Sequence, residues 1–209
     1  MMDIKVKICG LTNIEDARYA VACGADYLGF VLVPSSPRYV SAEAVQAMIS
    51  DLPEEIPKVG VFVNRPLHEM EQILEFTGLS IAQLHGDEPA DVARQLGVER
   101  VWKVCTLRTA ADVDAAMTFP ADVLVADTAV GGRRGGTGQV GDWGLAADLA
   151  SRRRLLLAGG LNPENVVAAV RRVRPFGVDV SSGVEQSPGN KDPQKVKAFI
   201  AAVRKSNIQ

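Results

Sequence analysis

Cys9 ends an alternating segment and could act as a base or a nucleophile. In residues 4–9 (IKVKIC), Lys5, Lys7 and Cys9 share one face of an extended chain. A buried lysine is rare unless it is paired or functional. A thiol has an unperturbed pKa of about 8.5, which a nearby positive charge can lower. Cys9 is therefore either a small buried hydrophobe or a thiolate that can accept a proton.

Asp127 ends a second apolar segment, residues 122–127 (DVLVAD), and could donate a proton. At an ordinary pKa near 3.9, only about one carboxyl group in a thousand is protonated at pH 7. A general acid at this position would need burial or a neighbouring carboxylate to raise its pKa substantially. The alternative is an aspartate that caps or fixes a loop.

Small residues in two later segments could bind an anion through their backbone amides. Residues 158–163 (AGGLNP) follow one apolar run, and residues 179–185 (DVSSGVE) end another. A short helix starting after Ser182 and Gly183 would direct its positive end toward the same anion. Two tight glycine turns are the alternative. The glycine-rich segment 131–138 could close over a ligand or be merely flexible.

Three other side chains could contact a ligand. Arg38 could bind a carboxylate through two hydrogen bonds, or it could lie in solvent. Gln83 and His85 share one face at the end of a segment, and His85 could be a base or make a structural hydrogen bond. Cys105 also ends a segment, so its position does not exclude a role. Cys23, near the end of a helical stretch, is expected to pack in the core.

Eight repeats of a short β-branched run and an amphipathic stretch must position these side chains. The expected strands are 4–9, 26–33, 58–64, 80–85, 100–105, 122–127, 154–160 and 177–182. The expected helices are 14–24, 42–52, 67–78, 88–97, 110–119, 144–151, 163–173 and 192–205. This alternation indicates a parallel sheet built from βαβ units.

Eight units, at about 26 residues each, predict an α/β fold that is a single (β/α)8 TIM barrel over residues 1–209. An open doubly wound sheet is the alternative, which the lack of a GxGxxG pattern after the first run disfavours. Barrel enzymes hold their chemistry at the carboxyl ends of the strands. Cys9 and Asp127 both lie at such ends.

Composition and charge disfavour several classes of protein. The 209 residues carry 23 Lys and Arg against 25 Asp and Glu, which disfavours a nucleic-acid binder that relies on bulk positive charge. No apolar run approaches the ~20 residues of a membrane-spanning helix, and the first ten residues lack an apolar signal region. Three widely spaced cysteines fit neither a disulfide framework nor a zinc site. We therefore expect a cytoplasmic enzyme without a metal.

The motifs together resemble the phosphoribosylanthranilate isomerase family of tryptophan biosynthesis. They run in order along nearly the whole chain: KICGLT (7–12), GADYLGFV (24–31), PSSPRYVS (34–41), GVFVN (60–64), QLHGDE (83–88), LVADT (124–128), GGTG (135–138), AGGLNPENV (158–166) and DVSSGVEQSPGNKD (179–192). The first and last of these motifs are the most diagnostic.

The resemblance implies an Amadori rearrangement of N-(5-phosphoribosyl)anthranilate to an aminodeoxyribulose phosphate, with no metal or organic cofactor. Asp127 would be the general acid and Cys9 the general base. Arg38 would bind the anthranilate carboxylate, and Asp179 would order a loop whose backbone amides hold the phosphate. The residues expected to bind substrate are Arg38, Gln83, His85, Gly138, Gly160, Asp179, Ser181, Ser182 and Gly183. The partner would be this phosphorylated riboside, bound by a monomer or a homodimer.

Two departures from the family pattern and two alternatives accompany this interpretation. Gly141 stands where the family commonly has an aromatic residue, and Arg133–Arg134 is a less typical insertion, so lid closure could differ. A related phosphoribosyl isomerase of the histidine pathway uses a pair of aspartates, one of them at the position of Cys9. A non-catalytic barrel that binds phosphate sugars is the other alternative.

Overall fold

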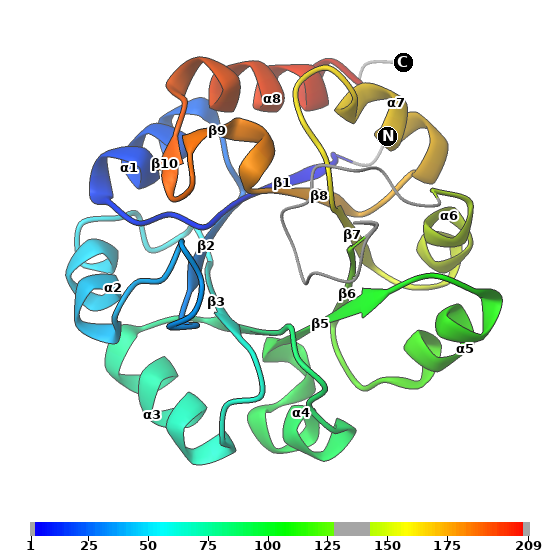
Figure 1. The fold of residues 1–209 in the computed structure, drawn as a ribbon, viewed down its shortest axis with the longest axis horizontal. Helices are drawn as coiled ribbons and strands as arrows, with labels where there is room; N and C mark the ends of the chain where they lie inside the picture. The colour runs from blue at the N-terminus through cyan, green and yellow to red at the C-terminus, as the bar shows by residue number, and fades with distance from the viewer. Residues whose placement is uncertain (1–2, 128–142, 207–209) are drawn as a thin grey trace.

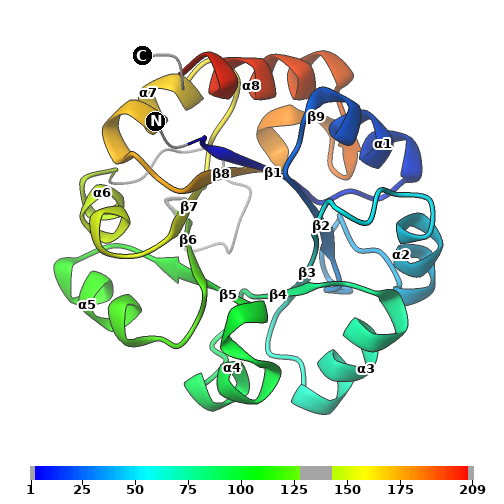
Figure 2. The same cartoon turned by 180° about the vertical axis from the view of Figure 1, so that it is seen from behind.

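The computed structural model describes residues 3–127 and 143–206, whose eight parallel strands close into a barrel ringed by helices (Figures 1 and 2). The strands are β1 (Lys5–Cys9), β2 (Tyr27–Val31), β3 (Lys58–Phe62), β4 (Ile81–Leu84), β5 (Val101–Thr106), β6 (Val123–Asp127), β7 (Leu155–Ala158) and β8 (Gly177–Val180). Each strand pairs in parallel with the next, and β1 pairs with β8 to close the ring. The predicted (β/α)8 barrel is confirmed.

Helices follow the strands and cover the outside of the barrel. They are α1 (Ile14–Cys23), α2 (Ala42–Ile49), α3 (Leu67–Thr77), α4 (Ala90–Leu96), α5 (Ala110–Thr118), α6 (Trp143–Arg152), α7 (Val166–Val173) and α8 (Pro193–Ser206). A short 3-10 helix, η1 (Val98–Arg100), precedes β5. Side-chain caps begin several of these helices: the Ser41 hydroxyl, for example, accepts a hydrogen bond from the Ala44 backbone N–H at the start of α2.

Helix α7 starts later than the sequence pattern predicts, at Val166 instead of residue 163. The side-chain oxygen of Asn162 accepts hydrogen bonds from the backbone N–H groups of Glu164 and Asn165. These two bonds hold a turn, so the backbone first becomes helical beyond Asn165.

Two apolar cores flank the strands. The larger core lies between the barrel and the helices, and the smaller one fills the barrel interior. In the interior, Tyr27 and Trp102 meet edge to face, with ring centroids 4.9 Å apart. The other buried members of this smaller apolar core are Val59, Val123, Val125, Leu156 and Ala158. Because side chains alternate along a strand, polar residues at the strand ends continue these interior rows toward the carboxyl end.

A hairpin that the sequence pattern did not predict follows β8 and the 3-10 helix η2 (Ser182–Val184). Its antiparallel strands are β9 (Glu185–Ser187) and β10 (Asn190–Lys191). Figures 1 and 2 both show the hairpin next to α1. Its β10 strand binds the start of α1, because the Lys191 backbone N–H donates to the Asp16 carboxylate over 2.9 Å.

Candidate active site

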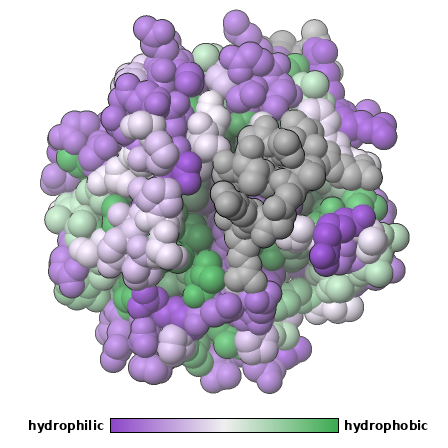
Figure 3. Space-filling view, viewed as in Figure 1, coloured by the Kyte–Doolittle hydropathy of each residue, from purple (hydrophilic) through white to green (hydrophobic). Residues whose placement is uncertain are grey.

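A cavity of about 570 Å³ opens at the carboxyl ends of the strands. Figure 3 views this face and shows apolar atoms near its middle, surrounded by hydrophilic side chains. Most of the site residues expected from the sequence line the cavity: Cys9, Arg38, Gln83, His85, Asp127, Gly160, Asp179, Ser181 and Ser182. Gly138, the segment 131–138, the Arg133–Arg134 insertion and Gly141 lie outside the described residues. Apolar side chains from β2, β3, β5 and β6 complete the walls.

Cys9 lies at the end of β1 and is 7% exposed. Lys7, two residues earlier on the same face, is fully buried, and its Nζ lies 3.1 Å from Oδ1 of Asp179 on β8. Burial raises the pKa of the Cys9 thiol above its usual value, and the positive charges of Lys7 and Lys191 offset only part of that rise. The expected lowering by nearby cations is therefore present but smaller than the effect of burial.

Asp127 ends β6 and is 9% exposed. Its Oδ2 lies 3.7 Å from Nε2 of His85, which follows β4. The structure thus brings a carboxyl group, an imidazole and the Cys9 thiol to one cavity, from the carboxyl ends of β6, β4 and β1. These are group types that can move protons at a bound substrate.

Arg38 reaches the cavity from the loop after β2, and Glu185 of β9 fixes its orientation. The guanidinium donates from Nε to Glu185 Oε1 (2.8 Å) and from Nη2 to Glu185 Oε2 (2.7 Å). Those bonds use two of its five N–H groups. Although burial raises the pKa of Glu185, the hydrogen bonds and charges of Arg38 and Lys191 outweigh it and hold the pKa below its usual value. Sequence reasoning identified Arg38 and missed Glu185.

Lys191 of β10 connects this ion pair to the base candidate, and it too was missed. Its Nζ donates to the Cys9 carbonyl (2.6 Å), to Glu185 Oε1 (2.9 Å) and to the Ser181 carbonyl (3.3 Å). The side chain is 1% exposed. One ammonium therefore joins the ends of β1 and β8 to the hairpin. The only signal in the sequence was a charged residue in a motif without an assigned role.

Gln83 lies deeper than His85 on the same face of β4 and is 2% exposed. Among the described residues, its Oε1 atom is buried without a hydrogen-bond partner. A buried acceptor without a partner is costly, and this oxygen can accept a hydrogen bond from a group that enters the cavity.

The buried ion pair between Lys103 and Glu88 holds the loop that follows β4. The Glu88 carboxylate accepts hydrogen bonds from the backbone N–H groups of Asn64 and Gly86 and from Lys103 Nζ, at 2.8 to 3.0 Å. Lys103 Nζ also donates to the Gly86 carbonyl (2.7 Å). These contacts fix the segment that carries His85, and no pattern in the sequence indicated them.

The loops after β7 and β8 meet at Gly183. A Cβ atom there would overlap the backbone carbonyl oxygen of Leu161, so any side chain would push the two loops apart. Gly183 itself does not line the cavity, whereas Gly160, Ser181 and Ser182 do. The backbone of Gly160 has a φ of 65°, in the left-handed region that favours glycine. The two loops thus approach each other as closely as bare backbone allows.

The two other cysteines face away from the cavity. Cys105 lies next to Val104 on β5, and whereas Val104 lines the cavity, Cys105 packs against the helix-side core. Burial also raises the pKa of Cys105 to about 11, and both its position and its burial argue against a role in the cavity. Cys23, at the end of α1, packs against the same core, as expected.

Neither a metal cluster nor a membrane span is found in the part of the chain that the structure describes. No group of three or more His, Cys, Asp or Glu side chains there could hold a metal ion. None of the helices in residues 3–127 and 143–206 is both long enough and apolar enough to cross a bilayer.

Comparison with known proteins adds a family to this geometry. Residues 6–202 match the family described as N-(5'phosphoribosyl)anthranilate (PRA) isomerase. A protein of that name from Pseudomonas fluorescens is 46% identical over 210 residues, covering 99% of each chain. The crystal structure of phosphoribosyl anthranilate isomerase from Thermotoga maritima is 40% identical with a TM-score of 0.90, covering 97% of this chain and 99% of that one. A Thermus thermophilus structure of the same name is 38% identical with a TM-score of 0.86, covering 99% and 100%.

Proposed function

Because the chain belongs to the N-(5'-phosphoribosyl)anthranilate isomerase family and isomerises that substrate in tryptophan biosynthesis, we propose that Cys9 and Asp127 carry its proton transfers. The observation that supports this assignment is their meeting in one cavity from β1 and β6. The established fold places catalytic groups of barrel enzymes at this end of the strands.

In the proposed mechanism, Asp127 donates a proton to the furanose ring oxygen, and the C1–O bond breaks to give an open-chain iminium. The Cys9 thiolate then removes the proton from C2; the electrons of that C–H bond form the C1–C2 double bond, and the π electrons of the iminium bond move to its nitrogen. The resulting enolamine tautomerises to the ketone. The substrate's own iminium accepts the electrons in this scheme, so the chemistry calls on acid and base groups of the chain.

The remaining lining residues would bind the two charged ends of the substrate. Arg38, with N–H groups left over from its contact with Glu185, would bind the anthranilate carboxylate. Backbone amides of Gly160 and Ser182 would hold the phosphate, with Gly183 keeping the loops close. A family member has been crystallised with reduced 1-(o-carboxyphenylamino)-1-deoxyribulose 5-phosphate, which supports a ligand with both charged groups.

Gln83, His85, Asp179, Ser181 and Gly138 complete the proposed binding set. The first four line the cavity, and Gly138 is proposed on the resemblance alone. The Gln83 oxygen would accept a hydrogen bond from a substrate N–H or hydroxyl group, which its lack of a partner among the described residues supports.

Single substitutions test the two catalytic roles. Purified Cys9→Ala and Asp127→Asn are each mixed with the anthranilate riboside, and the loss of anthranilate fluorescence is followed. We expect each variant to lose activity by about a hundredfold or more, as removal of a general acid or base does. Cys105→Ala is the matched control. Near-normal turnover by Cys9→Ala or Asp127→Asn removes that residue from its role.

Quaternary structure and location stay predictions. We propose a monomer or a homodimer, and an isomerase from Thermotoga maritima described as dimeric supports the second. Light scattering on the purified chain separates the two. A cytoplasmic location and the lack of a nucleic-acid partner likewise remain proposals from sequence and charge.

A further inference from the structure

Lys7 is a buried cation that does not line the substrate cavity, yet it lies beside the proposed base. Its side chain is fully buried, and its Nζ is 3.1 Å from Oδ1 of Asp179. A Cβ atom on Gly29 of β2 would lie 2.8 Å from Cys9 Sγ and 3.0 Å from Lys7 Cε. The thiol and the lysine stem therefore pack against the same bare stretch of β2, which leaves them adjacent.

Resting on the assignment of Cys9 as the base, we propose that Lys7, held in place by Asp179, is the counter-charge of the Cys9 thiolate. Lys7 is then a positioning residue that acts through Cys9. When the thiolate takes the C2 proton of the substrate and becomes a thiol, Lys7 stays an ammonium because Asp179 still neutralises it. No proton leaves or enters the Lys7–Asp179 pair during the step.

The other charges that face Cys9 have partners of their own. Lys191, from β10, is bound to the Cys9 carbonyl and to Glu185, and Arg38, from the loop after β2, is bound to Glu185. From β8 comes the carboxylate of Asp179, and the facing position on β2 is a glycine. Lys7 is also paired, with Asp179, but its stem packs beside Cys9 Sγ against Gly29, so it is the cation placed to stabilise negative charge on sulfur.

The two members of the pair should act on the thiol in opposite directions. The ammonium of Lys7 lowers the pKa of Cys9, and the carboxylate of Asp179 raises it. An opposite charge within about 4 to 6 Å shifts a pKa by roughly one to three units. Removing Lys7 should therefore make Cys9 harder to ionise, and removing the charge of Asp179 should make it easier.

Alkylation of Cys9 by iodoacetamide measures this ionisation without turnover. Cys23 and Cys105 are first replaced by Ala so that mass spectrometry reports Cys9 alone, and the rate is measured against pH. In this background we expect Lys7→Met to raise the midpoint by about one unit or more. We expect Asp179→Asn to lower the midpoint, and the acid limb of kcat/KM to move with it.

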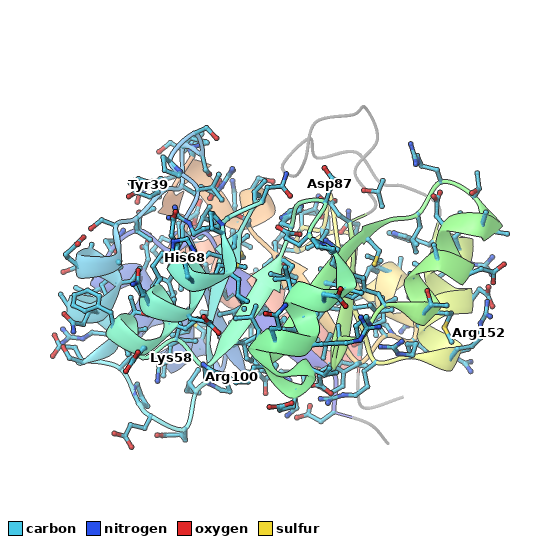
Figure 4. The ribbon with its side chains drawn as sticks, turned by 90° about the horizontal axis from the view of Figure 1, so that it is seen from below. Tyr39, Lys58, His68, Asp87, Arg100 and Arg152 are labelled. Carbon is cyan, nitrogen blue, oxygen red and sulfur yellow. The ribbon has the colours of Figure 1, made fainter. Side chains whose placement is uncertain are left out.

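Lys58→Met is the matched control for loss of a buried strand lysine. Lys58, on β3, is 5% exposed, and its Nζ donates to the Pro53 carbonyl. Figure 4 shows Lys58 toward the opposite end of the molecule from Tyr39 and Asp87, which lie in loops at the carboxyl ends of the strands. In Lys58→Met, the midpoint of Cys9 alkylation should equal that of the parent.

An unchanged midpoint in folded Lys7→Met overturns the proposal, as does a shift of equal size in Lys58→Met. If Lys7→Met does not fold, Asp179→Asn is the test. A pH midpoint of Cys9 alkylation that rises or stays constant in Asp179→Asn overturns the proposal, and a midpoint that falls supports it. Failure of the catalytic assignment gives a different result, since Cys9→Ala would then turn over while the alkylation midpoints still shifted.

Discussion

Replacing Glu185 by Gln tests whether the ion cluster at the hairpin orients Arg38 and supports the site. The Glu185 carboxylate is 5% exposed and accepts hydrogen bonds from Arg38, from Lys191 Nζ and from the Gly189 backbone N–H. Gln has nearly the same shape but lacks the charge, and its NH₂ group would face other donors. Lys191 would then be a buried ammonium without its carboxylate.

The expected loss of stability follows from that isolated charge. Removing one partner of a buried ion pair costs about 3 to 5 kcal/mol. For a chain of this size the melting temperature should fall by on the order of 10 °C. Urea unfolding at pH 7 measures the change in free energy, with the exposed residue Glu75 as the control in Glu75→Gln.

The same substitution should affect substrate binding more than chemistry. Without Glu185, Arg38 must be ordered when substrate binds, which costs about 0.5 to 1.5 kcal/mol and corresponds to a two- to tenfold rise in KM. Values of kcat should change less, because neither Cys9 nor Asp127 is altered. If Glu185→Gln unfolds at the same urea concentration as Glu75→Gln and keeps its KM, the cluster has neither effect.

The stabilisation by Glu185 should also depend on pH in a defined direction. Its pKa is held below the usual value, so the ionised form is favoured in the folded chain. The contribution is present above about pH 4.3, the ordinary pKa of a glutamate, and is lost as the pH falls through the folded value. The stability difference between the parent and Glu185→Gln should therefore shrink in acid.

Three further substitutions test other parts of the site. Gly183→Ala should raise KM about tenfold or more, because its Cβ would displace Leu161 and separate the loops after β7 and β8, which we propose hold the phosphate. A KM within twofold of the parent contradicts this. Cys105→Ala should keep kcat and KM within about twofold, since Cys105 faces the helices; a larger loss would give it a role. Gln83→Leu should raise the free energy of unfolding in urea by about 1 to 3 kcal/mol, because Oε1 of Gln83 is buried without a partner among the described residues. Its kcat/KM should fall by up to tenfold. A lower free energy of unfolding would show that Gln83 has a partner in the folded chain.

The strands were predictable because their signal is local. Each β-branched run ends near a residue that the fold then places at the carboxyl end, as Cys9 and Asp127 illustrate. Boundaries were less predictable where side chains compete for backbone groups. Asn162 delays α7 by holding the residues before Val166 in a turn, and such a bond depends on local geometry that periodicity does not contain.

The residues that support the site were not predictable for a different reason. Glu185 and Lys191 have partners more than a hundred positions away in the chain, Arg38 and the Cys9 carbonyl. No pattern in one segment indicates such a pairing. The hairpin that carries both residues is also short, with strands of three and two residues, so it has almost no alternating pattern to detect.

The distribution of buried ion pairs among the described residues indicates why this barrel holds them near the carboxyl ends of its strands. A buried ion pair contributes little stability, and apolar side chains of similar volume often do as well or better. Deeper in the barrel the chain does use apolar side chains, with Trp102 and Val123 among them. The ion pairs Lys7–Asp179 and Lys191–Glu185 instead lie where the strands end at the cavity. Because stability does not explain the position of these ion pairs, we attribute it to the chemistry at the cavity. A site that transfers protons and binds two anionic groups requires charges that are fixed before the substrate arrives.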